Sequence, residues 1–287
     1  MFCDTTLPTL DLSYANSLAL LLPINPRTVQ LVLVGCGGTG SWLAPHVARV
    51  ARMLIDKFNR QVEVNFIDPD RVEEKNIYRQ NFCMAEVGEY KAVTLARRCG
   101  QAWNLPILAH TCALSDAAGT KISTFDLRVI AGCVDRASAR REIWKAAGYG
   151  NAWWLDCGNE KSSGQVLLGR GAVCTEDPFS FPGYCSWLPS PAIQHPDLLK
   201  DQPAPAETDV SSLSCADMAL LNAQGLGVNP QIAATAGDYL WQMLVYGNLR
   251  RMATYLDLAA GSTRSTYITR EAVMNTIDDR TRKFWSK

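Results

Sequence analysis

Four glycines crowd the segment Gly35-Cys-Gly-Gly-Thr-Gly40, which follows a short β-branched run and precedes a helix-like run. Without side chains in the way, such a loop presents backbone amides at a helix N terminus, where the helix dipole also favours phosphate. We expect Gly35, Gly37, Gly38 and Gly40 to cradle a di- or triphosphate. The alternative is that the glycines only form a tight strand-to-helix turn. Asp68 stands at the end of the next expected strand, where dinucleotide-binding folds place the carboxylate that reaches the ribose.

A dense polar segment follows this carboxylate. It reads Asp68-Pro-Asp-Arg-Val-Glu-Glu-Lys-Asn-Ile-Tyr-Arg-Gln-Asn-Phe82, with Gly88-Glu-Tyr-Lys91 shortly after. A nicotinamide site has no need for these residues. They resemble the ThiF/MoeB/HesA superfamily of ubiquitin-activating-type adenylyltransferases, whose hallmark is Asp-x-Asp-x-Val-Glu-x-Ser-Asn-Leu-x-Arg-Gln followed by Gly-x-x-Lys. Lys75 and Ile77 replace the common Ser and Leu, and neither change removes a charge-bearing group.

The resemblance implies an ATP site. It implies that Asp68 holds the ribose, that Asn76, Arg79 and Lys91 contact the phosphates, and that Asp70 and Gln80 belong to the same nucleotide site. The chemistry agrees, because attack of a carboxylate on the α-phosphate builds negative charge that a fixed guanidinium and ammonium can offset. The alternative for Arg79 and Lys91 is a solvated surface pair.

Asp135 ends a strand-like run in the segment Ala131 to Arg141, which is similar to the family's Cys-x-Asp-Asn-x-x-x-Arg. The resemblance implies that Asp135 holds Mg²⁺ beside the phosphates, and a hard cation prefers such an oxygen ligand. Arg136 replaces the common Asn. Capping of the following helix is a second role open to Asp135.

Cys215 raises a separate question. In Ser214-Cys-Ala-Asp217 it begins a helix, a setting that lowers the pKa of a thiol, and relatives that carry a thioester place the cysteine in a comparable region. A thiolate there could accept the acyl group; a buried, inert thiol is the alternative, and Cys174 and Cys185 are lesser candidates. The 10 cysteines are scattered singly, as reduced thiols are. Many relatives bind structural zinc through two Cys-x-x-Cys pairs, which this sequence lacks, so no zinc is expected.

The elements that must position these residues alternate along the chain. Strands are expected at Val29–Val34, Val62–Ile67, Pro106–His110, Leu127–Ala131, Trp153–Asp156 and Gln165–Leu168, and helices from Ser41 to Phe58, Gly88 to Gln101 and Ala137 to Ala147. The second helix should bury Val93, Leu95 and Ala96, and a turn containing Gly158, Asn159 and Gly164 should join the last two strands. This alternation predicts an α/β fold, with a Rossmann-like, largely parallel sheet flanked by helices.

The chain divides into three expected segments. Residues 1–173 form the ATP-binding adenylation domain. Residues 174–213 form a crossover connector without regular structure, which contains half of the 14 prolines. Residues 214–287 add helices, interrupted near Gly225 to Gly227 and at Pro230, and a strand pair at Tyr255–Leu258 and Ser265–Ile268, all packing on the same domain.

Charge and composition limit the partners. Lys plus Arg and Asp plus Glu number 28 each, so no broad field favours nucleic acid or an anionic membrane. The apolar stretch Leu18 to Leu22 stops at Pro23, which supports neither a secretory signal nor a membrane span, and we expect a cytoplasmic protein.

The resemblance also implies a substrate and an assembly. The family adenylates the C-terminal carboxylate of a small ubiquitin-like or sulfur-carrier protein that ends in glycine, and its members commonly form homodimers. The short length, the missing zinc cysteines and the helix at Ser214 with Gln224 and Asn229 look most like the ThiF-related proteins of bacterial plasmid PRTRC cassettes. Two other functions stay open: a nucleotide-binding adaptor without turnover, and an NAD-dependent oxidoreductase, which does not account for Arg79, Lys91 and Asp135 together.

Overall fold

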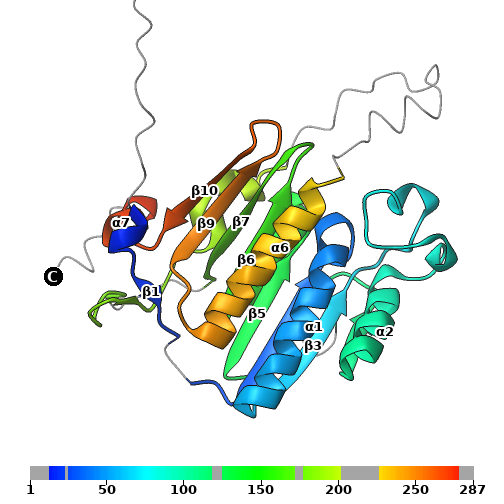
Figure 1. Cartoon of the computed structure of the whole chain (residues 1–287), viewed down its shortest axis with the longest axis horizontal. Helices are drawn as coiled ribbons and strands as arrows, with labels where there is room; N and C mark the ends of the chain where they lie inside the picture. The colour runs from blue at the N-terminus through cyan, green and yellow to red at the C-terminus, as the bar shows by residue number, and fades with distance from the viewer. Residues whose placement is uncertain (1–12, 23–24, 118–124, 172–176, 202–225, 278–287) are drawn as a thin grey trace, which may run out of the picture.

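The computed structural model describes residues 13–22, 25–117, 125–171, 177–201 and 226–277. At their centre lies an eight-stranded sheet with the order β10-β9-β7-β6-β5-β2-β3-β4 (Figure 1). The strands are β2 (Thr28–Val34), β3 (Gln61–Ile67), β4 (Ile107–His110), β5 (Leu127–Gly132), β6 (Ala152–Asn159), β7 (Ser163–Arg170), β9 (Arg251–Asp257) and β10 (Ser262–Tyr267). Strands β2 to β6 are parallel, and β7, β9 and β10 run antiparallel to their neighbours. The prediction of an α/β fold with a largely parallel sheet is confirmed.

Helices cover both faces of the sheet. Helices α1 (Gly38–Phe58), α2 (Lys91–Trp103) and α6 (Val228–Trp241) pack on one face, and Figure 1 shows α1 and α6 side by side across it. Helix α3 (Ala137–Ala147) and the short α4 (Pro191–Gln194) pack on the other. Strand β2 alternates accordingly, because Leu31 and Leu33 belong to the core under α1 whereas Val32 and Val34 belong to the core under α3.

Smaller elements complete the described chain. They are β1 (Ala19–Leu20), which pairs in parallel with β8 (Tyr184–Cys185); 3-10 helices at Ser13–Asn16, Glu74–Asn76, Met84–Glu86 and Pro196–Leu199; a π-helical turn at Gln242–Tyr246; and α7 (Arg270–Thr276). Three of these elements fall in the expected connector, namely strand β8, helix α4 and the 3-10 helix Pro196–Leu199. The prediction that this stretch lacks regular structure is therefore wrong for its described part.

Helix α2 differs from its prediction in phase. It begins at Lys91 rather than Gly88, and its buried positions include Ala92, Leu95, Ala96 and Cys99, spaced for one helical face. Val93 is 40% exposed, so its expected place on the apolar side is wrong.

The segments around β7 and α6 also need correction. Gly158 and Asn159 end β6 and Gly164 lies inside β7, so all three belong to strands rather than to the connecting turn. Helix α6 runs through Pro230, because a proline in the first turn lacks only an amide that has no intrahelical partner there. The expected strand pair is β9 and β10, which extend the central sheet beyond β7. The helix expected from Ser214 lies outside the described residues up to residue 225.

Candidate active site

A cleft of about 1150 Å³ opens at the carboxyl ends of β2, β3, β5 and β6. This edge of a parallel sheet is where open α/β folds bind ligands. The predicted site residues that line the cleft are Gly35, Gly37, Gly38, Asp68, Asp70, Asn76, Arg79, Gln80, Lys91 and Asp135. Of the predicted site residues in the described part of the chain, only Gly40 stands behind the lining, and Cys215 lies outside the described residues.

The glycine loop is shaped by two close approaches. Gly35 has φ of +86°, and a Cβ there would lie 2.5 Å from the carbonyl oxygen of Cys133. A Cβ on Gly40 would lie 1.8 Å from the carbonyl oxygen of Gly35, so the helix start could not pack on the loop. Gly37 is different, because the nearest atom to a Cβ there is 3.8 Å away and the position opens into the cleft. No described side chain caps the N terminus of α1, which leaves its first amides available to an anion.

Asp68 anchors this loop from β3. Its carboxylate accepts hydrogen bonds from the backbone amides of Cys36, at 2.6 Å, and Asp70, at 2.8 Å. Burial raises the pKa of Asp68, and the two amide bonds oppose that shift. The side chain therefore fixes the loop against β3, and its expected contact with a ribose stays a prediction.

Lys91 carries the most enclosed cation of the predicted set. The residue is 6% exposed, its ammonium lies 3.0 Å from the carboxylate of Asp70, and its amide donates to the carbonyl of Asp70. The Asp70 side chain is 65% exposed, so the pair bridges the cleft wall and solvent. An ammonium held in this way adds a fixed positive charge to the wall of the cleft.

The segment that carries Arg79 is fixed through its backbone. Asn76 accepts a hydrogen bond from the amide of Glu73 at 3.1 Å and closes the 3-10 helix Glu74–Asn76. The carbonyl of Arg79 accepts bonds from the indole of Trp42 and the side-chain amide of Asn229, each at 3.3 Å. Helices α1 and α6 thus both position Arg79.

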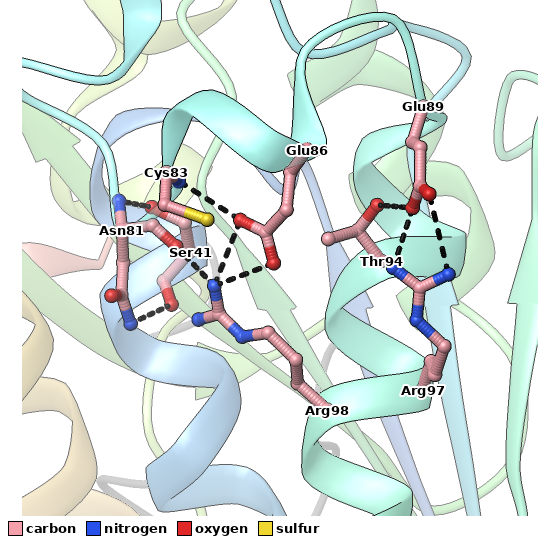
Figure 2. A network of polar contacts seen from close by, with 8 residues as sticks. All are labelled: Ser41, Asn81, Cys83, Glu86, Glu89, Thr94, Arg97 and Arg98. Carbon is pink, nitrogen blue, oxygen red and sulfur yellow. Dashed lines mark hydrogen bonds and ion pairs between the residues drawn. The ribbon is translucent and has the colours of Figure 1, made fainter.

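A polar network supports the stretch between Arg79 and Lys91 (Figure 2). Asn81 donates through its amide to the hydroxyl of Ser41 at 2.9 Å and through its side chain to the carbonyl of Ser41 at 3.2 Å. Arg98 of α2 donates to the carbonyl of Asn81 at 2.9 Å and pairs with the carboxylate of Glu86 at 3.1 Å. This network ties the loop to α1 and α2, the helices that bear Gly38 and Lys91.

Asp135 follows the end of β5 by three residues, is exposed and lines the cleft, and its carbonyl accepts a hydrogen bond from Arg140 at 3.1 Å. Arg140 also contacts the buried carboxylate of Asp156 at 3.3 Å. Burial raises the pKa of Asp156 to about 6 although Arg140 lowers it. The N-cap of α3 is Arg136, and no side chain of the described residues caps this helix, so the capping role considered for Asp135 is wrong.

A buried amide and hydroxyl cluster was not predicted. Asn159 of β6 donates to the hydroxyl of Thr39, at 2.7 Å, and to the side-chain oxygen of Asn229. Asn229 also lies against Gly38, where a Cβ would stand 2.7 Å from its oxygen. The asparagine at the second position of helix α6 was the available sequence signal, but only the fold shows which residues it contacts.

Of the two lesser thiol candidates, only Cys185 lies in the described part of the chain. Cys174, like Cys215, lies outside the described residues. Cys185 is buried in β8, where its thiol donates to the carbonyl of Trp187 at 2.9 Å, so it offers no accessible nucleophile. Within the described ranges no three His, Cys, Asp or Glu side chains gather as a metal-binding group. None of the helices in this part of the chain combines the length and apolar character needed to cross a bilayer.

Together these features define a Rossmann-like α/β protein in which a glycine loop, an arginine, a lysine and three aspartates share one cleft at the carboxyl edge of the sheet. The profile of the ThiF family matches residues 25–219, and the chain belongs to that family.

Solved structures share the fold. Escherichia coli MccB with ATP is 15% identical, with 84% of this chain and 64% of that chain covered and a TM-score of 0.54. The same protein with AMPCPP and MccA gives 15% identity, 84% and 64% coverage and a TM-score of 0.52. PaaA is 17% identical, with 84% and 64% covered and a TM-score of 0.51. The chain thus spans about 64% of the length of these structures. A search of curated proteins found no match.

Proposed function

We propose that this chain binds ATP in the cleft and adenylates the C-terminal carboxylate of a peptide or small protein. The observation that carries the proposal is the convergence of Gly37, Arg79, Lys91 and Asp135, drawn from distant parts of the sequence, around one cavity. A site for a nucleoside triphosphate needs amide donors, fixed positive charges and an oxygen ligand for a hard metal cation in one place. Membership in the ThiF family and the ATP-bound MccB structure support the same reading.

The reaction follows from this placement. A carboxylate oxygen of the substrate attacks the α-phosphorus of ATP, the bond to the β-phosphate oxygen breaks, and pyrophosphate leaves while an acyl-adenylate remains. The nucleophile belongs to the substrate, so the enzyme supplies positioning and charge. Lys91 and Arg79 offset the charge that builds on the phosphoryl oxygens and on pyrophosphate, and the amides at the start of α1 hold the phosphate chain.

Magnesium fits the residues present. Asp135 places one carboxylate in the lining of the cleft, and Mg²⁺ is commonly held by one or two carboxylates together with substrate phosphates rather than by an all-protein cluster. Asp135 would hold the ion, which neutralises phosphate charge when it is bound.

The identity of the acceptor is a narrower proposal. The structure of MccB with AMPCPP and MccA records a nucleotide analogue and MccA together with a similar fold. The family resemblance favours a ubiquitin-like or sulfur-carrier protein that ends in glycine, as in PRTRC cassettes, with Cys215 as the residue that takes the acyl group as a thioester. We also propose a homodimer, and light scattering at the monomer mass would reject it.

ATP–pyrophosphate exchange tests the proposed reaction. The protein is incubated with ATP, Mg²⁺, labelled pyrophosphate and a candidate peptide or protein with a free C terminus, and label entering ATP is counted. Exchange that depends on the carboxylate supports adenylation. ATP binding without exchange at saturating acceptor supports the adaptor instead. NADH binding in place of ATP binding would support the oxidoreductase.

A further inference from the structure

The cleft does not end at the phosphate-facing residues. It continues over the antiparallel strands, where its lining includes Gln165 of β7, Tyr255 of β9 and Arg264 of β10. The register places these side chains in one row, because Gly158 pairs with Gln165, Gln165 with Tyr255, and Tyr255 with Arg264. Directly paired residues of antiparallel strands project to the same face. The row therefore leads from the catalytic end of β6 outward to the sheet edge.

The connector provides a wall for this extension. His195, at the end of α4, is hydrogen-bonded to the hydroxyl of Tyr255 at 2.5 Å, and its ring packs edge-on against the Tyr255 ring. Leu198 of the following 3-10 helix also lines the cleft. Burial lowers the pKa of His195, which keeps the pair uncharged near pH 7. A neutral, partly apolar wall of this kind suits a peptide backbone better than a second phosphate group.

Arg264 supplies the charge at the far end. Within the described residues its guanidinium forms no hydrogen bond or ion pair, although it faces the cleft and lies near the Tyr255 hydroxyl. In the neighbouring carboxylate of Asp257, the oxygen Oδ1 accepts the amides of Ala259 and Ala260 at 3.0 and 3.1 Å. An arginine that lines a cleft and has no partner among the described residues is available to a carboxylate of the substrate.

We propose that Arg264 is a specificity-determining residue that binds an acidic side chain in the tail of the adenylated polypeptide. This inference rests on the proposed function. The tail would lie across β7, β9 and β10 beside the His195–Tyr255 pair, with its carboxyl end at Gly158. Tyr255 and Arg264 lie outside residues 25–219, so family membership carries no expectation for them.

Sheet dimensions fix where the acidic residue stands. Three strand spacings separate β6 from β10, or about 14 Å, and an extended peptide covers about 3.4 Å per residue. Allowing for the two side chains, the acidic residue falls about four to six positions before the C-terminal carboxylate. A tail with Asp or Glu in this window should bind about tenfold more tightly than a tail with Lys there, which is the usual contribution of one charge-assisted hydrogen bond to affinity.

A peptide-selection experiment tests this subsite. Immobilised full-length protein, loaded with the ATP analogue AMPCPP, is exposed to a pool of random decapeptides with free C-terminal carboxylates, and the retained peptides are sequenced by mass spectrometry. We expect enrichment of Asp and Glu in the window for the wild-type protein, its loss in Arg264→Ala, and its replacement by Lys and Arg in Arg264→Glu. Lys57→Glu applies the same charge reversal at an exposed position at the end of α1, and it should select as the wild type does.

The outcomes separate the two proposals. AMPCPP retention is measured first in every protein, and its absence in the wild type would overturn the proposed function and the subsite together. If AMPCPP is retained but no peptide binds, or acidic tails are not enriched, the subsite is wrong while ATP binding stands. Enrichment that is unchanged in Arg264→Glu would likewise overturn the role of Arg264.

Discussion

Lys91 offers the clearest separation of catalysis from stability. We predict that Lys91→Met lowers ATP–pyrophosphate exchange by on the order of 10²-fold, the effect of losing about 3 kcal/mol of transition-state stabilisation from one charged donor. The Lys91 side chain is only 7% exposed, and methionine keeps most of its buried apolar stem. The Asp70 carboxylate that pairs with it is 65% exposed, so the lost ion pair should cost less than about 1 kcal/mol of unfolding free energy. Exchange kinetics and urea unfolding on the same preparations measure both quantities.

Asp70→Asn is the matched control. It removes the 3.0 Å ion pair but leaves the ammonium in the cleft, so exchange should fall no more than about fivefold. Equal losses in Lys91→Met and Asp70→Asn would mean that the lysine acts only through its partner. We expect Lys91→Met to lower exchange by roughly 10²-fold. If the exchange rate of this variant stays within about threefold of the wild-type rate, the assignment of this ammonium to the phosphates is refuted.

Three further predictions concern the loop, its support and the buried carboxyl. Gly40→Ala places a Cβ 1.8 Å from the carbonyl oxygen of Gly35, so we expect the free energy of unfolding to fall by about 1–3 kcal/mol and ATP binding to be lost. Calorimetry measures the binding, and wild-type affinity for ATP would contradict the loop geometry. Arg98→Ala removes the anchor of Asn81 and Glu86, and amide exchange around residues 81–90 should quicken while α6 stays protected. The pKa of Asp156 is about 6 in the folded state and 3.8 ordinarily, so between these pH values the folded state binds one proton more than the unfolded state. The contribution of Asp156 to the free energy of unfolding should therefore fall by about 3 kcal/mol from pH 4 to above pH 6. Urea unfolding of the wild type and of Asp156→Asn measures this contribution, and a difference between them that stays constant with pH would disprove the prediction.

The alternating strands and helices up to Ala147 were predictable because each is encoded by its own local sequence pattern. The β-branched run before Gly35 and the alternation of strands and helices up to Ala147 carry strong periodicity, and observed strands and helices match them closely. The motif residues Arg79, Lys91 and Asp135 were predictable as a group because the resemblance links them, and the cleft brings them together.

What the sequence could not supply are contacts between distant segments. Nothing near Tyr255 indicates that β9 extends the sheet beside β7, since that pairing joins residues about ninety positions apart. The same holds for β8, a two-residue strand defined only by its partner β1. Pro230 misled the prediction of α6 because the sequence alone does not show at which helical position the proline falls.

The contact between Thr39 and Asn229 spans 190 residues. During synthesis, the glycine loop leaves the ribosome long before its last supporting side chain is made, a delay of roughly 10–40 s at ordinary elongation rates. Throughout that interval the nascent chain carries an incomplete pocket. The cleft proposed to bind nucleotide is therefore completed late in translation, and truncated products that lack α6 should bind ATP more weakly than the full chain.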